Sequence, residues 1–400
     1  MWQKIKNIYH LLTALFAAVF FNFPSKKLTV IGVTGTDGKT TTVNMIYHIL
    51  KTAGKKVSMI SSVNAQIGDK IYDTGFHVTT PDPWQIQKYL NEAVRSGSNF
   101  FVLETTSHGL DQNRLAFVDF EVGVVTNITH EHLDYHKTWE KYAASKAKLL
   151  KNSKISVLNI DDKKSFNFLK TRVGGKIVTY GKFSLADINP KRFPLNLQIP
   201  GSFNLANALA AAATCSSLLI EKENILKTLS NFQGVIGRLE EIDLGQDFRV
   251  FIDFAHTPNG LEQALKTLRS QLTAHNSQLI IVFGAAGERD RSKRLMMGKI
   301  AGKLADIIIL TAEDPRSEKA EDICEQIKNG IRNKKDGKNL FIIPDRRQAI
   351  EKAISIAQPH DVVATFGKGH EKSMTFGSKD YPWDEFAVVK EAIKSRQNEK

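Results

Sequence analysis

The sequence predicts an α/β protein with two domains, each built on a mostly parallel sheet that helices cover on both faces. Two observations carry this prediction. Apolar, strand-like runs alternate with amphipathic helical patterns almost throughout the 400 residues, as they do in chains of βαβ units. The alternation is interrupted once and begins again after Gly237, which places a domain boundary there.

The first domain, residues 28–236, contains the first alternation. Its expected strands are Leu28–Thr34, Lys56–Ile60, Phe100–Leu103, Val122–Asn127 and Ile155–Ile160. Its expected helices are Thr41–Leu50, Pro83–Arg95, Thr138–Leu150, Ser202–Leu219 and Lys222–Phe232. Between these elements, Lys182–Pro200 has the pattern of short strands broken by proline.

The second domain, residues 237–400, repeats the alternation and is expected to be a Rossmann-like α/β domain. Its expected strands are Phe248–Phe254, Gln278–Phe283, Asp306–Leu310, Asn339–Ile343 and Asp361–Thr365. Its expected helices are Pro258–Ala274, Lys293–Leu304, Lys319–Arg332, Arg346–Ala357 and Trp383–Lys394. An apolar helical segment, residues 1–27, precedes both domains.

The turn after the first strand is the strongest functional signal. It reads Gly-Thr-Asp-Gly-Lys-Thr-Thr from Gly35 to Thr41 and leads into a helix. Backbone N–H groups of such a turn cradle phosphate oxygens, and the helix N-terminus adds to the attraction. Lys39 is placed to reach the terminal phosphates and the Thr40 hydroxyl to hold Mg²⁺. Val33 occupies the first glycine position of the strict motif, but the strand–turn–helix context predicts a P-loop ATPase domain that binds ATP or GTP.

Other polar clusters follow predicted strands, where open α/β sheets bind ligands. Glu104 is well placed to bind the Mg²⁺ of the nucleotide, although a lone glutamate at a strand end is often only solvated. The run Asn127–His136 holds three histidines and two acids, which leaves a metal site and structural histidines both open. Lys146 by itself resembles a surface lysine. In the second domain, similar polar clusters lie mostly at the ends of the expected strands. They are GRLE, DFAHTP, Gly284–Arg294, EDPR and GKGHE.

Composition narrows the class of protein. A hydrophobic content of 42% and a charged content of 24% are ordinary for a soluble globular protein. The two cysteines, Cys215 and Cys324, lie in apolar helical segments, which favours a cytoplasmic location over a disulfide framework. The net charge of +13 suits polyanionic ligands. Because no stripe interleaves aromatics with arginine, nucleic acid is not expected as a partner.

The N-terminal segment is unusual. Leu11–Phe23 is nearly all apolar, follows Lys4 and Lys6 and ends at Pro24. It is too short for a membrane span, which needs about 20 residues. Two interpretations remain: a helix packed on the first domain, which we favour, or an interfacial helix that touches the membrane through residues 8–23. We expect a monomer.

Taken in order, GTDGKTT, TTP at 79–81, ETTSHGLDQNR, HLDYH, SKAK, GSFNLAN, GRLE, DFAHTP, GERDRSKR, EDPR and GKGHE resemble the Mur ligase family. The likeness is closest to the UDP-N-acetylmuramoyl-tripeptide synthetases (MurE type). It implies an ATP-dependent ligase of peptidoglycan precursor synthesis that phosphorylates a carboxylate and lets an amine displace the phosphate. The small-molecule substrates that it implies are a muramoyl-L-Ala-D-Glu acceptor and a diamino acid.

The resemblance also assigns roles to residues. The implied catalytic residues are Lys39, Glu104, His132 and Lys146, and Mg²⁺ would be held by Thr40, Glu104, His132 and Lys146, the last as a carbamate. The implied ATP-binding residues are Gly35, Thr36, Asp37, Gly38, Lys39, Thr40, Thr41, Asn207, Arg238, Asp253 and His256. The implied acceptor-binding residues are Thr79, Thr80, Thr106, Gln112 and Arg114. The implied amino-acid-binding residues are Arg289, Glu313, Asp314, Pro315, Arg316, Gly367 and Glu371.

Two departures from the family pattern affect the substrates. Enzymes that add meso-diaminopimelate usually carry Asp-Asn-Pro-Arg where this chain has Glu313-Asp314-Pro315-Arg316. The retained arginine favours diaminopimelate over L-lysine, because it pairs with the distal carboxylate that lysine lacks. The family also has an N-terminal domain of roughly a hundred residues that binds the uridine diphosphate, whereas about 27 residues precede the first strand here. The resemblance therefore implies that the usual uridine site is absent.

Three alternatives stay open. The acceptor is lipid-linked, or it is another γ-carboxylate of the folylpolyglutamate or poly-γ-glutamate type, or the chain is a nucleotide-binding scaffold without turnover. The motifs TTP, ETTSHGLDQNR and GKGHE favour a cell-wall substrate. The presence of Lys39, Glu104 and Lys146 argues against the scaffold.

Overall fold

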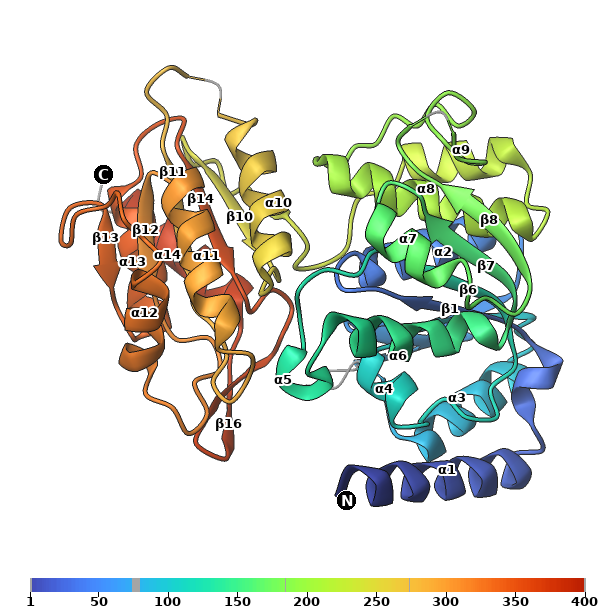
Figure 1. The fold of residues 1–400 in the computed structure, drawn as a ribbon. Coiled ribbons are helices and arrows are strands. Elements are labelled where there is room, and N and C mark those ends of the chain that lie inside the picture. The colour runs from blue at the N-terminus through green and yellow to red at the C-terminus, as the bar shows by residue number, and fades with distance from the viewer. Residues whose placement is uncertain (1, 74–79, 184, 273, 399–400) are drawn as a thin grey trace. The chain divides into compact units, whose positions relative to one another are not determined.

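The computed structural model describes residues 2–73, 80–183, 185–272 and 274–398. The chain folds into two compact units. Unit 1 comprises the chain up to Thr129 together with His136–Gln233, and unit 2 comprises His130–Tyr135 and the chain from Gly234 onward. Each unit contains one large, mostly parallel sheet with helices packed on it, so the predicted fold class is confirmed (Figure 1).

Unit 1 contains an eight-stranded sheet in the order β4-β3-β2-β5-β1-β6-β7-β8. Its strands are β1 (Thr29–Thr34), β2 (Val57–Ile60), β3 (Asn64–Ile67), β4 (Lys70–Asp73), β5 (Phe100–Glu104), β6 (Phe120–Val125), β7 (Ser153–Asn159) and β8 (Lys176–Tyr180). All neighbours are parallel except at the hairpin β3–β4, which pairs antiparallel with β2. Because β1 lies between β5 and β6, the loops that follow these three strands emerge side by side.

The helices of unit 1 cover both faces of this sheet. They are α1 (Trp2–Phe20), the 3₁₀ turn η1 (Pro24–Lys27), α2 (Lys39–Thr52), α3 (Pro83–Arg95), α4 (Ser107–Asp111), α6 (Trp139–Lys151), α7 (Lys163–Leu169), α8 (Ser202–Ser217) and α9 (Lys222–Ser230). Figure 1 shows α2, α8 and α9 on one face and α3, α4 and α6 on the other. The short α5 (Leu133–His136) begins in the 130–135 segment and ends in unit 1.

Helix α3 illustrates why these elements form. Asp82 accepts hydrogen bonds from the backbone N–H groups of Trp84 and Gln85, which are otherwise unsatisfied at a helix start. Pro83 occupies the first helical position, where no N–H is needed. Ile86 and Leu90 recur one turn apart and are fully buried against strands β1 and β5. Burying each such side chain stabilises the fold by about 2 kcal/mol.

Unit 2 contains a six-stranded sheet in the order β13-β12-β11-β14-β10-β9 and a separate hairpin, β15–β16. Its strands are β9 (Glu240–Ile242), β10 (Arg249–Asp253), β11 (Leu279–Phe283), β12 (Ile307–Leu310), β13 (Leu340–Ile342), β14 (Val362–Phe366), β15 (Ser373–Phe376) and β16 (Lys379–Pro382). In the six-stranded sheet only β9 is antiparallel to its neighbour. The carboxyl ends of β10, β14, β11 and β12 therefore lie along one edge.

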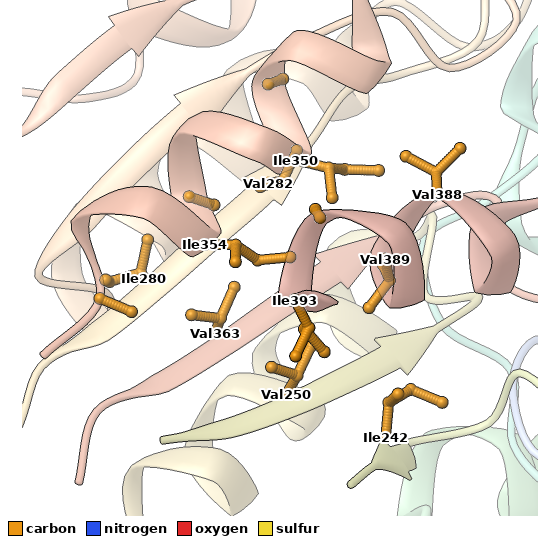
Figure 2. Packing of buried hydrophobic residues seen from close by; sticks show 14 of the residues in the cluster. Ile242, Val250, Ile280, Val282, Ile350, Ile354, Val363, Val388, Val389 and Ile393 are labelled. Atoms are coloured by element: carbon orange, nitrogen blue, oxygen red, sulfur yellow. The ribbon is translucent and has the colours of Figure 1, made fainter. Parts of the chain in front are cut away.

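The helices of unit 2 are α10 (Pro258–Arg269), α11 (Ser292–Leu304), α12 (Ala320–Lys328), α13 (Arg346–Ile356) and α14 (Glu385–Asn398). Figure 2 shows how α13 and α14 pack on the sheet. Ile350 and Ile354 of α13 and Val389 of α14 contact strand residues such as Val250 and Val363. All five are at most 1% exposed, so this layer is a hydrophobic core that holds the strand ends in place.

The structure corrects several sequence-based expectations. Lys182–Pro200 does not form strands in its described residues: only Ile188 makes an isolated bridge, to Tyr180. The sheet there is completed by β8, which precedes that segment. The hairpins β3–β4 and β15–β16 and the edge strand β9 were not expected, since they are short and polar. No helix in the described part of the chain is long and apolar enough to cross a membrane.

Candidate active site

The glycine-rich turn of unit 1 is held in shape by its neighbours. Asp37 donates its N–H to Asn127 Oδ1 at 3.0 Å, and its carbonyl accepts a 2.7 Å bond from Thr126 Oγ1. Gly38 has a φ of 80° and caps α2, and a Cβ on it would lie 2.2 Å from Asn207 Oδ1. Glycine is required here because any side chain would collide with α8. Asn207 is thereby brought against the turn, as the predicted nucleotide site requires.

The polar side chains at the start of α2 meet the end of β5. Thr40 Oγ1 lies 3.2 Å from Glu104 Oε1, and both side chains are buried. Ser62, at the end of β2, donates its N–H at 2.9 Å and its hydroxyl at 2.9 Å to the same carboxylate. Lys39 donates to the carbonyl of Thr36 at 2.8 Å. The structure therefore places a hydroxyl and a carboxylate together beside a phosphate-binding turn.

Lys146 is not a surface residue. Its side chain, on α6, is 1% exposed and donates a 2.7 Å hydrogen bond to the carbonyl of Gly35. Its ammonium lies 4.5 Å from the centre of the Tyr142 ring. Burial first, and then the charge of Lys39, hold the pKa of Lys146 well below its usual value. A neutral amine is the form of lysine that reacts with carbon dioxide, so the environment suits a carbamate.

The predicted acceptor-binding residues also lie together in unit 1. Thr80 Oγ1 accepts a 2.9 Å bond from the N–H of Thr106, and the two hydroxyls are 3.0 Å apart. Arg114 donates to the carbonyl of Thr80 at 3.0 Å and to Gln112 Oε1 at 2.6 Å. Thr79 lies outside the described residues. The other four side chains present hydroxyl, amide and guanidinium groups near the carboxyl end of β5.

The histidine cluster is divided between the two units. His132 has a left-handed backbone (φ 57°) and belongs to the 130–135 segment of unit 2, whereas Glu104 and Lys146 belong to unit 1. His136 is buried, and its Nε2 lies 3.1 Å from Ser107 Oγ. Burial first, and then His108, lower the pKa of His136 to about 4. His136 is therefore neutral at neutral pH, which is the form of both a structural histidine and a metal ligand.

In unit 2, Arg238, Asp253 and His256 gather around one aromatic ring. The guanidinium of Arg238 lies 4.5 Å from the centre of the Phe254 ring, and the His256 ring lies 4.7 Å from it. Asp253 accepts the N–H groups of Leu239 at 2.7 Å and Ala255 at 2.8 Å. These contacts fix the carboxyl end of β10, and Phe254 is a residue that sequence reasoning did not single out.

The loops that follow β11 and β12 are in close backbone contact. Gly287 donates its N–H to the carbonyl of Asp314 at 2.8 Å, and a Cβ on Gly287 would lie 1.9 Å from the carbonyl of Pro315. Arg316 has a φ of 54° and is held by the hairpin: its N–H donates to Thr375 at 3.1 Å. Desolvation first, and then the charge of Arg316, lower the pKa of Arg289. The structure thus brings the two predicted guanidinium groups near each other.

Acidic residues line the same place. Gly367, at the end of β14, touches Glu313: a Cβ on this glycine would lie 2.9 Å from Glu313 Oε2. Glu313 is buried, and burial above all raises its pKa to about 7. Among the described residues, Glu313 Oε2 has no hydrogen-bond partner. A buried carboxylate oxygen without a donor is suited to receive an ammonium group from a ligand.

Lys368 completes the cluster, although the sequence gave no reason to select it beyond its place in GKGHE. Its ammonium is buried and donates to Asp314 Oδ1 at 2.9 Å and to Glu371 Oε2 at 2.6 Å. Burial opposes its charge, but Glu371 and Asp314 outweigh this and raise the pKa of Lys368. The negative charge that distinguishes Asp314 from an asparagine is therefore partly balanced inside the protein, by an ammonium that it shares with Glu371.

Comparison with known proteins agrees with this arrangement. The Mur ligase middle domain matches residues 33–215, and the family's C-terminal domain, described as "Mur ligase, glutamate ligase domain", matches residues 237–369. The chain belongs to the Mur ligase family. A Caldanaerobacter subterraneus protein named UDP-N-acetylmuramoyl-L-alanyl-D-glutamate–2,6-diaminopimelate ligase is 40% identical over 399 residues, covering 95% of this chain and 81% of that protein.

This Mur ligase is also similar to two further proteins. A Borreliella burgdorferi protein named UDP-N-acetylmuramyl-tripeptide synthetase is 40% identical over 407 residues, covering 95% of this chain and 79% of that one. A solved structure of a UDP-N-acetylmuramoyl-L-alanyl-D-glutamate–2,6-diaminopimelate ligase is 31% identical with a TM-score of 0.61, covering 92% of this chain and 79% of that one. The tripeptide-synthetase resemblance is thereby confirmed.

The residues of this Mur ligase fit a magnesium ion. Mg²⁺ prefers oxygen ligands, and it usually takes one or two from the protein and others from water and substrate phosphates. The adjacent Thr40 hydroxyl and Glu104 carboxylate supply such a pair. In the described ranges no group of three or more His, Cys, Asp or Glu side chains could hold a metal ion by itself. The phosphates of a nucleotide would therefore have to complete the site.

Proposed function

We propose that this Mur ligase joins a diamino acid, meso-diaminopimelate rather than L-lysine, to a muramoyl-L-Ala-D-Glu acceptor with hydrolysis of ATP to ADP and phosphate. The observation that carries the proposal is the Thr40–Glu104 contact beside the Gly35–Gly38 turn, because it combines a phosphate site with Mg²⁺ ligands. The names of relatives about 40% identical support the same reaction.

The reaction needs two displacements. An acceptor carboxylate oxygen attacks the γ-phosphorus of ATP, so that the bond to ADP breaks and an acyl phosphate forms. The amine of the amino acid then attacks the acyl carbon, loses a proton and expels phosphate. The chain's role is to position these groups and balance their charge. Mg²⁺, when bound at Thr40 and Glu104, would neutralise part of the phosphate charge.

Each unit is proposed to bind different groups. In unit 1, the residues from Gly35 to Thr41 and Asn207 would hold the phosphates, and Thr80, Thr106, Gln112 and Arg114 would hold the acceptor. Lys146, as a carbamate, would carry a negative charge suited to a second Mg²⁺. In unit 2, Arg238, Asp253 and His256 would contact the nucleotide. The amino acid would be held by the residues from Glu313 to Arg316 with Arg289, Gly367 and Glu371.

The charges in unit 2 favour diaminopimelate. The charge of Arg316 lowers the pKa of Arg289, while Asp134, Glu131 and Asp314 act on it in the opposite direction. The two guanidinium groups would form the carboxylate-binding part of this site. Such a site attracts the distal carboxylate of diaminopimelate and repels the distal ammonium of lysine. The pairing of Asp314 with Lys368 reduces the effect of its charge on this preference, although Lys368 is shared with Glu371. Glu313 Oε2 is suited to an amino group of the same ligand.

The test is to incubate the protein with ATP, Mg²⁺ and each diamino acid, using UDP-linked and lipid-linked muramoyl dipeptides and a folate or poly-γ-glutamate acceptor. The proposal expects ADP release that depends on a muramoyl dipeptide and on diaminopimelate. Release with only the folate or glutamate acceptor would contradict the cell-wall substrate. If no acceptor supports ADP release while ATP still binds, the chain is a scaffold.

A further inference from the structure

The N-terminal helix α1 has two distinct faces. Its small residues Ala14, Ala17 and Ala18 are at most 1% exposed and turn toward the body of unit 1, where α1 packs along α3. Near the other end, Asn7 donates to the carbonyl of Asp111 at 3.0 Å. These contacts anchor α1 along its length, so one side of the helix is firmly held (Figure 1).

The opposite face of α1 is apolar and exposed to solvent. Its members recur every three or four residues, which places them along one side of a helix. They are between 38% and 64% exposed and comprise Ile5, Ile8, Tyr9, Leu11, Leu12, Leu15, Phe16, Val19 and Phe20. Monomeric soluble proteins rarely expose an apolar patch of this extent, and such patches mark interaction sites.

Aromatic side chains close one end of this face. Trp84 of α3 stacks with Phe16 at a ring-centre distance of 5.9 Å and lies 5.1 Å from Phe20 and 5.2 Å from Phe21. Tryptophan and phenylalanine are favoured at the boundary between lipid headgroups and acyl chains. The cluster therefore has the composition of an interfacial surface and not that of a water-facing helix.

The helix segment itself carries charges of one sign. No acidic residue occurs between Trp2 and Lys27, whereas Lys6, Lys26 and Lys27 are exposed. The acidic residues Asp111 and Asp82 lie near the packed side of the helix, next to Asn7 and His10. A second copy of this chain docked face to face would bring these like charges together at a cost. An anionic lipid surface would instead attract each of them. The charge pattern thus favours a membrane surface over self-association.

We propose that the exposed face of α1, with Lys6, Lys26 and Lys27, binds the surface of an anionic lipid bilayer, with the helix axis in the plane of the headgroups. The helix cannot cross a membrane, so its apolar side chains enter the outer part of one leaflet and the protein remains on one side. This inference goes beyond the proposed ligase reaction and does not depend on it.

The experiment is sedimentation of the full chain with vesicles of equimolar phosphatidylglycerol and phosphatidylethanolamine, compared with phosphatidylcholine vesicles. The apolar variant is I8Q/L12Q/V19Q, which leaves the aromatic contacts with Trp84 intact. Its matched control is I71Q/L185Q/L219Q, three other exposed apolar residues of unit 1. The charge variant is K6Q/K26Q/K27Q, and its control with equal net charge is K379Q/K390Q/K394Q. Circular dichroism checks that each variant is folded.

The wild type and both controls are expected to sediment with anionic vesicles and only weakly with neutral ones. Each lysine near such a surface is worth about a fivefold change in affinity, so the charge variant should bind roughly a hundredfold more weakly at low salt. The apolar variant should lose about tenfold or more. The proposal fails if the wild type stays in the supernatant or if both α1 variants bind as the wild type does. A wild-type dimer that the apolar variant converts to a monomer, without vesicle binding, would identify a second copy as the occupant and overturn the proposal.

Discussion

Lys146 in unit 1 and Lys368 in unit 2 are equally buried, yet their environments act on them in opposite directions. Lys146 donates to a backbone carbonyl, and burial with Lys39 nearby lowers its pKa. Lys368 lies between two carboxylates that raise its pKa in spite of burial. Burial alone therefore does not decide the charge of a lysine; the partner at hydrogen-bond distance does.

This difference matches the work that each region would do. A lysine that is easily neutral can be modified by carbon dioxide, which suits a site that must hold Mg²⁺ and phosphates. A lysine that stays charged can pair with Asp314 and so reduce the negative charge that acts on the nearby guanidinium groups. The two sites thus differ in how a buried lysine is held: Lys146 donates to a backbone carbonyl, whereas Lys368 is paired with two carboxylates.

The largest effect is expected from Lys146→Ala. Removing a preorganised charged group at the phosphate site should lower kcat about a thousandfold. Short carboxylates such as acetate should restore part of the activity, because they replace the negative group of a carbamate. ADP release measures both effects, with Lys141→Ala on the exposed side of α6 as the control. Full activity of the alanine variant would show that this lysine plays no part in turnover.

Lys368→Met tests the pairing in unit 2. It leaves Asp314 and Glu371 without their buried cation, so the free energy of unfolding should fall by at least about 3 kcal/mol. Urea denaturation measures the loss, and Lys394→Met, at an exposed position of α14, is the control. Adding Asp314→Asn to the variant should recover part of the loss. An unaltered stability in Lys368→Met would mean that the ion pairs contribute nothing.

Arg316→Ala tests whether the paired guanidinium groups select the substrate. A charged hydrogen-bonded pair in a partly buried site is worth up to about 3 kcal/mol, so kcat/KM for diaminopimelate should fall about a hundredfold. The low activity with lysine should change little or rise. Steady-state kinetics with both amino acids measures the ratio, and Arg332→Ala is the control. A preserved ratio would place the selecting residues elsewhere.

The smallest effect is expected from the Arg294–Glu318 pair, which supports the loop that carries Arg289. Hydrogen bonds from Arg294 are the main cause that lowers the pKa of Glu318 to about 2. Because the folded pKa lies below the ordinary value of 4.5, the stabilisation is present above about pH 4.5 and is lost as the pH falls toward 2.

The variant Glu318→Gln should lose the part of the folding stability that depends on the ionised Glu318 carboxylate. The variant should be less stable than the wild type by about 2 kcal/mol near neutral pH, because the buried Arg294 loses a charged hydrogen-bond acceptor, and the gap should narrow in acid. Urea unfolding at several pH values measures the gap, with Glu223→Gln on exposed α9 as the control. A gap that does not depend on pH would argue against the ion pair.

Elements with a strong local pattern could be read directly from the sequence. Pro83–Arg95 has the bounds expected of it, since proline, a capping aspartate and a buried face all act within one segment. The hairpins β3–β4 and β15–β16 were missed because each of their strands has only four residues, so that an alternation of polar and apolar residues, as in β3, is too short to identify a strand. The strands expected within Lys182–Pro200 were wrong, since apolar residues between prolines do not by themselves find a pairing partner.

The sequence by itself determined the α/β class and the position of the glycine-rich turn, because these depend on periodicity and glycine placement. It also supplied the residues proposed for the two sites, through motifs a few residues long. Only the tertiary structure decided which charges are isolated and which are paired. It buried Lys146 against Gly35, joined Lys368 to Asp314 across 54 residues, and left one face of α1 uncovered. Burial and pairing depend on contacts between segments that are far apart in the sequence. Such contacts cannot be read from a pattern of a few neighbouring residues.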